Sequence, residues 1–179
     1  MCMLFVDRPS SMNAVMYLEK GVWLGLAAIG FAVLFNVPRR ALGVIFVIAA
    51  LGGLAKLLMV EHGVVIALAA FAGASLIGVL SVMAAHQRKA PPMIFAIPAV
   101  IPMIPGFFAY QAMVGMIELT LQKDPQLYSK LFFETVNNGL SALFVLLALS
   151  TGVAIPMLIT RKQTIKRLQP DDNLEVEMD

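Results

Sequence analysis

The strongest constraint on the fold is a succession of five apolar segments, each of which, as a helix, would be long enough to cross a bilayer. They cover residues 17–37, 41–60, 64–85, 93–121 and 131–159, and short polar or charged stretches separate them. A helix needs roughly 20 apolar residues to cross the hydrocarbon core of a membrane. The chain is 60% hydrophobic and 13% charged, whereas a soluble domain has about 25% charged residues. The sequence therefore predicts an all-α integral membrane bundle of about five transmembrane helices.

The two ends of the chain differ from this apolar middle. Residues 1–16 form a short N-terminal extension that lacks the basic start and apolar core of a cleaved signal peptide. Residues 161–179 are first basic and then acidic, as in a short cytoplasmic tail. We therefore expect one transmembrane domain, residues 17–160, between two short appendages.

Basic residues predict how the helices cross the membrane. With five crossings the loops alternate sides, and one side then holds eight basic residues: Arg39, Arg40, Arg88, Lys89, Arg161, Lys162, Lys166 and Arg167. The other side holds Arg8, Lys20, Lys123 and Lys130. Cytoplasmic loops carry the excess of Lys and Arg, which predicts an inner-membrane protein with its N-terminus outside and its C-terminus in the cytoplasm. A re-entrant fourth segment would instead leave four crossings and both ends on one side.

The fourth apolar segment contains three prolines and a glycine between Pro98 and Gly106, in the order Pro98-Ala99-Val100-Ile101-Pro102-Met103-Ile104-Pro105-Gly106. Proline has no backbone N–H and its ring clashes with the carbonyl four residues back, so the fourth helix is predicted to break here. In lipid, the freed carbonyl groups must find partners in protein or in a water-filled cavity. Such breaks mark substrate sites in many transporters, although a proline kink can also serve packing alone.

Small residues recur at the spacing that brings membrane helices together. Gly21 and Gly25 form a GxxxG pattern in the first segment, and Ala148 and Gly152 repeat the spacing in the fifth. In the third, a stripe comprises Ala70, Ala74 and Gly78, with Ala69 and Gly73 beside it. Close helix packing in lipid depends on such residues. These stripes predict helix contacts, either within the chain or with another subunit.

No pattern typical of an enzyme is present. The two histidines, His62 and His86, lie in turns between segments, and no nucleophile–base, zinc or phosphate-loop motif occurs. Cys2 is the only cysteine, which excludes an internal disulfide. The sequence therefore predicts neither catalysis nor a cofactor or metal.

Polar residues inside apolar segments are costly in lipid and often functional. Lys56 lies one turn from the end of the second segment, where it can extend to the headgroups or act as a counter-charge for an anionic substrate. Asn138 in the fifth segment can bind substrate or a neighbouring helix. Arg39 can anchor the cytoplasmic face or recruit anionic solutes to it.

Two stretches carry a family resemblance. They are Phe35-Asn36-Val37-Pro38-Arg39-Arg40-Ala41-Leu42 and the proline segment from Ile97 to Gly106, followed by Tyr110. With the five-segment plan, they resemble the threonine/serine exporter (ThrE) family, and within it the small YjjB-like subunit. The resemblance implies that this chain acts with a larger YjjP-like partner to export succinate or threonine and serine.

Together the resemblance and the physical argument nominate eight residues for substrate binding: Asn36, Arg39, Lys56, Pro102, Pro105, Gly106, Tyr110 and Asn138. The helix that resumes at Gly106 would offer free N–H groups and its positive dipole end to a carboxylate. Tyr110 and Asn138 would add hydrogen bonds, and Lys56 or Arg39 a positive charge. The competing hypothesis is a structural subunit that assembles a larger membrane complex without transporting anything itself.

Overall fold

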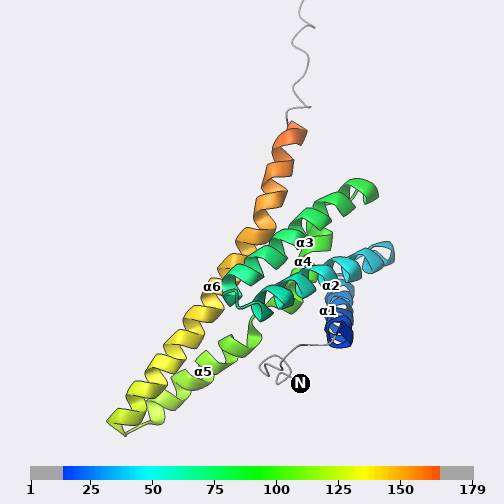
Figure 1. The fold of residues 1–179 in the computed structure, drawn as a ribbon. Coiled ribbons are helices and arrows are strands. Elements are labelled where there is room, and N and C mark those ends of the chain that lie inside the picture. The colour runs from blue at the N-terminus through cyan, green and yellow to red at the C-terminus, as the bar shows by residue number, and fades with distance from the viewer. Residues whose placement is uncertain (1–13, 166–179) are drawn as a thin grey trace, which may run out of the picture.

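A computed structural model describes residues 14–165, a range in which helices are joined by short turns and no strand occurs (Figure 1). The elements are α1 (Ala14–Leu34), α2 (Arg39–Glu61), α3 (Ile66–Arg88), α4 (Met93–Val100), the 3-10 turn η2 (Ile101–Met103), α5 (Gly106–Leu121) and α6 (Pro125–Ile165). Four of these helices are long and apolar enough to cross a membrane, and the bent α4–α5 pair makes a fifth candidate. The predicted all-α bundle with a break in its fourth segment is confirmed.

The helix boundaries differ from the expected segments mainly after α5. α6 begins at Pro125 rather than at residue 131, so only residues 122–124 connect it to α5. The Asp124 carboxylate accepts a hydrogen bond from the Gln126 N–H at 3.0 Å, which caps the new helix. Pro125 suits the first helical position because it has no N–H to leave unpaired there. At the other end α6 continues to Ile165, and what the sequence predicts for residues 1–13 and 166–179 lies outside the described residues.

Three helix C-termini are closed by the same backbone motif. Asn36, Gly63 and Lys89 follow α1, α2 and α3 and have left-handed φ values of 55°, 82° and 50°. After each, the next N–H donates to a carbonyl five residues back, as from Val37 to Ala32 at 2.9 Å. This pattern is the Schellman motif, for which glycine and asparagine are the usual left-handed residues. The turns between the first four segments are therefore short and defined.

Glycines let the helices approach one another closely, and between α2 and α3 the backbones themselves meet. A Cβ added at Gly25 of α1 would lie 2.5 Å from the Phe46 ring of α2, and one added at Gly73 of α3 would lie 2.7 Å from the Gly52 carbonyl oxygen of α2. Such distances are closer than side chains tolerate, so these positions accept only glycine without a shift. The GxxxG pattern of α1 and the small residues of α3 therefore pack within the chain.

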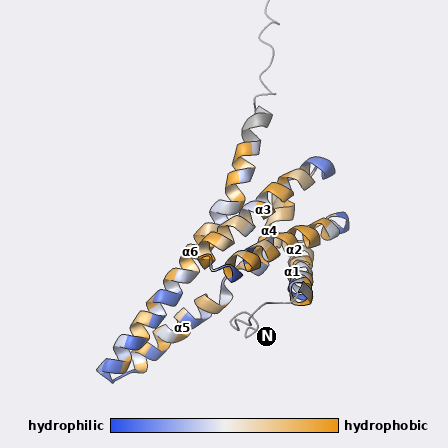
Figure 2. Cartoon of the chain, viewed as in Figure 1, coloured by the Kyte–Doolittle hydropathy of each residue, from blue (hydrophilic) through white to orange (hydrophobic). Residues whose placement is uncertain are grey.

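α3 and α6 also pack through small residues, and they run in the same direction. A Cβ added at Gly152 would lie 2.8 Å from Ala74 Cβ, and one added at Gly78 would lie 3.1 Å from the Val153 carbonyl oxygen. The C-termini of α3 and α6 thus share one end of the bundle. α2 runs opposite to α3 across a short turn, so its start at Arg39 lies at this end too, and Figure 2 shows hydrophilic tips on α2 and α3 there.

Candidate functional site

The broken fourth segment is the centre of the candidate site. α4 and η2 meet α5 at an angle of 53° across a break of two residues. At Ile104 the backbone is extended (φ −59°, ψ 133°), and Pro105 has φ −78° and ψ 61°. Pro102 and Pro105 supply no N–H, so the helical hydrogen-bond ladder cannot run through this point. The predicted break at residues 98–106 lies between Met103 and Gly106.

The backbone around Pro105 forms an inverse γ-turn. The Gly106 N–H donates to the Ile104 carbonyl at 2.8 Å, and the Pro105 dihedrals match this turn. The Gly106 N–H is therefore not one of the free N–H groups expected at the start of this helix. The first helical bond of α5 runs from the Ala109 N–H to the Pro105 carbonyl at 3.2 Å. The N–H groups of Phe107 and Phe108 consequently remain as the open donors at the positive end of this helix.

Lys56 reaches the break from α2. Its ammonium Nζ donates to the Met103 carbonyl oxygen at 2.9 Å, and the side chain is half-buried. The break frees this carbonyl from the helical ladder, and in lipid an unpaired carbonyl would cost several kcal/mol. In this structure the ammonium is directed at the Met103 carbonyl of the break. It stabilises the break and places a positive charge there.

Two glycines make room for this contact. Gly52 of α2 and Gly73 of α3 face each other, and a Cβ added at Gly73 would lie 2.7 Å from the Met103 methyl carbon and 3.2 Å from Lys56 Cβ. Larger residues at Gly73 would therefore push Met103 and Lys56 apart. Gly52 was not among the predicted site residues. Its signal in the sequence was the Gly52-Gly53 pair one turn before Lys56.

Tyr110 and Asn138 lie beyond the break, along the α5–α6 pair. Tyr110 is on α5 and is 65% exposed. Asn138 precedes Gly139, where an added Cβ would lie 3.7 Å from Ala112 Cβ of α5. Ala112 is about two turns past the start of α5, so Asn138 is not beside the break itself.

Asn36 and Arg39 lie at the other end of the bundle. Asn36 is the left-handed residue of the turn after α1, and Arg39 is exposed at the first position of α2. Lys56 follows Arg39 by 17 positions on the same helix, which is about 26 Å at the α-helical rise. The structure thus brings together Lys56, Pro102, Pro105 and Gly106, and it separates these four from Asn36 and Arg39.

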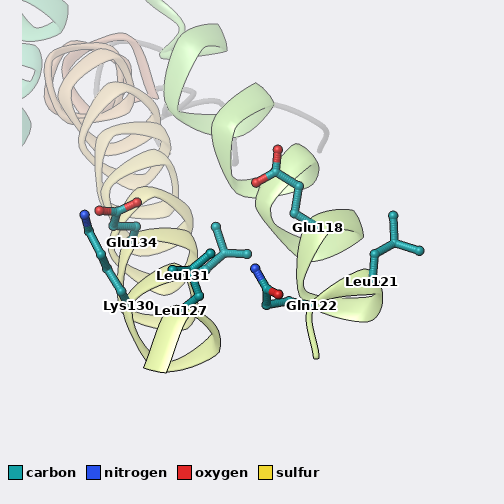
Figure 3. Close-up of a pocket in the computed structure, with 7 residues that line it drawn as sticks. All are labelled: Glu118, Leu121, Gln122, Leu127, Lys130, Leu131 and Glu134. Carbon is teal, nitrogen blue, oxygen red and sulfur yellow. The ribbon is translucent and has the colours of Figure 1, made fainter. Parts of the chain in front are cut away.

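A hollow lies far from the break, at the turn between α5 and α6. It has a volume of about 490 Å³, and its lining residues are Glu118, Leu121, Gln122, Leu127, Lys130, Leu131 and Glu134 (Figure 3). Within residues 14–165, no group of three or more His, Cys, Asp or Glu side chains could hold a metal ion. The described part of the chain therefore offers no metal centre, and the break is its most organised polar feature inside the bundle.

Comparison with known proteins assigns this architecture to a family. The model of the family described as "Threonine/Serine exporter, ThrE" matches residues 20–159, which include the whole break. The chain belongs to the threonine/serine exporter family. The family resemblance predicted from the sequence is confirmed, and the long apolar helices are those of a multi-pass membrane protein of this family.

One ThrE relative is an uncharacterized protein of Haemophilus influenzae. It is 34% identical over 142 residues, which are 79% of this chain and 47% of the relative. The chain thus spans about half the length of this curated relative. No solved structure matches the chain.

Proposed function

We propose that this chain is the smaller subunit of a two-part inner-membrane exporter for a small carboxylate-bearing metabolite. The substrate is either a dicarboxylate such as succinate or an amino acid of the threonine and serine type. One observation carries the proposal: the Lys56 ammonium is held at a broken helix, 2.9 Å from the Met103 carbonyl. Charged groups inside a membrane bundle are rare, and they mark substrate and ion pathways.

The groups at the break suit a carboxylate. The Phe107 and Phe108 N–H groups lie at the N-terminus of α5, where the helix dipole favours negative charge. Lys56 supplies a full positive charge, and the Met103 carbonyl that orients it is neutral. Half-helix N-termini bind substrate carboxylates in other transporters with broken helices. Tyr110 and Asn138 then lie along the outward path, and Arg39 at the opposite mouth attracts anions from the cytoplasm.

The partner in this proposal is a larger YjjP-like subunit. Its support is that the chain matches 47% of its Haemophilus relative, so a relative of full length carries about as much chain again. The cluster of Arg39, Arg40 and Arg88 at one end of the bundle supports a cytoplasmic C-terminus and an N-terminus outside.

The structural-subunit hypothesis is less well supported. Small-residue stripes that faced another subunit would favour it, but in this structure glycines of these stripes, Gly25, Gly73, Gly78 and Gly152, pack between helices of the same chain. A broken helix with a cation held at its centre adds nothing to a purely structural role. The two hypotheses differ in whether changes at the break alter transport without altering assembly.

Removing the break tests the proposal. Pro102 and Pro105 are replaced together by alanine, which restores the missing N–H donors and favours a continuous helix. We expect efflux from cells that carry both subunits to fall to background, while the variant still inserts and is recovered from membranes with its partner. The matched control is Pro156→Ala, since Pro156 is also inside a helix but lies on α6. Normal efflux from the double variant would refute the site.

Metabolite levels in a deletion strain distinguish the candidate substrates. Cells without this subunit are expected to accumulate either succinate or threonine, and plasmid-borne wild-type protein should reverse the accumulation. No change in any of the candidate metabolites would contradict the proposed transport.

A further inference from the structure

α6 is longer than a membrane requires. It has 41 residues and α3 has 23, about 61 Å and 34 Å at the α-helical rise, and the hydrocarbon core is about 30 Å thick. The two helices run in parallel and meet at Ala74 and Gly152. α3 begins at Ile66, eight positions before Ala74. Eight positions before Gly152, α6 has reached Phe144. The part of α6 before Phe144 therefore projects beyond the end of α3, as Figure 1 shows.

α5 accompanies this projecting part. Ala112 packs against Gly139, and Gly115 against Thr135, so the two helices are antiparallel neighbours. We call residues 112–138 the projecting hairpin. Its polar residues are Glu118, Thr120, Gln122, Lys123, Asp124, Gln126, Ser129, Lys130, Glu134, Thr135, Asn137 and Asn138. Such a density of polar groups is unfavourable in hydrocarbon, and Figure 2 shows the hairpin tip as hydrophilic.

The projecting hairpin nevertheless exposes large apolar side chains. The exposed ones are Met113, Met116, Ile117, Leu121, Leu127, Tyr128, Phe132, Phe133 and Val136. Phe133 is 70% exposed and Met116 65%. Large apolar side chains exposed outside the hydrocarbon favour a protein contact, and methionine and aromatic residues are enriched at such interfaces.

Charge on the hairpin indicates what covers it. In the hollow of Figure 3, Leu127 and Leu131 lie between Glu118 of α5 and Glu134 of α6, and Lys130 is on the same side as Glu134. Two carboxylates against one ammonium leave the rim negative. It therefore suits a partner that inserts an apolar side chain next to a basic one.

We propose that the projecting hairpin, residues 112–138, stands outside the hydrocarbon and is the docking surface for a second helical membrane chain. That chain is equivalent to the half of the Haemophilus relative that this protein does not match, since the relative carries about as much chain again beyond the matched part. The identity of the occupant rests on the two-subunit function proposed above, whereas the position of the hairpin does not.

Cysteine labelling tests the position. Met116→Cys and Phe133→Cys are each made in a Cys2→Ser background. Membrane fragments, both faces of which are accessible, are then treated with a charged maleimide that does not enter lipid. We expect labelling at both positions and none at Val79→Cys, an exposed position in the middle of the membrane-spanning α3. Unlabelled hairpin cysteines would place the hairpin in lipid and overturn the inference, whatever the transport assay shows.

Co-expression tests the occupant. When the larger exporter subunit of the same host is present, we expect the label at Met116→Cys and Phe133→Cys to fall at least fivefold. A photo-crosslinking residue at Phe133 should then join the two subunits. Full labelling beside a co-purifying partner would overturn the docking surface and leave the two-subunit exporter standing. Crosslinks between two copies of this chain, or protection without the larger subunit, would overturn the choice of occupant. Failure of the partner to co-purify would refute both the occupant and the two-subunit function.

Discussion

The contact between Gly52 and Gly73 makes a quantitative prediction. In Gly73→Ala the added methyl carbon would lie 2.7 Å from the Gly52 carbonyl oxygen, and C···O contacts ordinarily begin near ~3.3 Å. Because that oxygen belongs to the backbone, α2 and α3 must separate by about half an ångström at this point. Overpacking of this kind costs about 1–3 kcal/mol, and the better helix propensity of alanine offsets roughly 0.5–1 kcal/mol. We expect a net loss of about 1–2 kcal/mol in the free energy of unfolding.

The matched control is Gly30→Ala on α1, because no atom lies within 4 Å of a Cβ added there. Alanine should leave the stability unchanged or raise it by up to ~1 kcal/mol. Unfolding is followed by circular dichroism in detergent micelles as the denaturing detergent is increased, and efflux is measured in parallel. The Gly73 variant should also lose transport, since separating α2 from α3 shifts Lys56, whose Cβ would lie 3.2 Å from the added carbon, relative to the break. A Gly73→Ala protein as stable as the Gly30 control would refute the close approach of α2 and α3.

Three further predictions concern single side chains. Lys56→Met should abolish efflux and lower the free energy of unfolding by about 1–3 kcal/mol, because it leaves the Met103 carbonyl unpaired. Lys56→Arg keeps a donor and should retain the stability of the wild type. Equal losses of stability in both variants would argue against the hydrogen bond. Gly152→Ala should destabilise the protein by about 1–3 kcal/mol, because its Cβ would lie 2.8 Å from Ala74 Cβ. The control is Gly139→Ala on the same helix. Its Cβ would lie 3.7 Å from Ala112 Cβ, so it should leave the stability unchanged in the same unfolding assay. Thr135→Val should stabilise the protein by up to about 1 kcal/mol, since the buried Thr135 hydroxyl has no hydrogen-bond partner in the described structure; a measured loss would mean that the hydroxyl is satisfied.

Most of the fold follows from patterns that span many residues. The lengths of the apolar segments predicted the number of helices, and the prolines predicted where the fourth one breaks. The start of α6 was placed too late because the Asp124-Pro125 pair was assigned to a polar loop. An aspartate that caps, followed by a proline at the first helical position, is a start signal that outweighs local polarity.

The site was only partly predictable, because a substrate site depends on where helices meet. The sequence alone predicts the break at Pro102 and Pro105, since the effect of proline on the backbone is local. That Lys56 pairs with the Met103 carbonyl depends on the register of α2 against η2, which no single-helix pattern contains. Asn36 belongs to a distinctive motif, yet in this structure it provides the left-handed turn after α1. A polar residue in a motif can thus have a structural role in the backbone rather than a role in binding.

The Lys56 contact leaves room for a second binding event. A lysine ammonium has three N–H donors, and the Met103 carbonyl accepts only one of them. In the function proposed above, the substrate carboxylate would accept from the other two while the carbonyl keeps its own hydrogen bond, so the break would persist when substrate binds. Loading and unloading of such a site require no refolding of the segment around it. Turnover would then depend on how the surrounding helices open to each side rather than on the making and unmaking of the site.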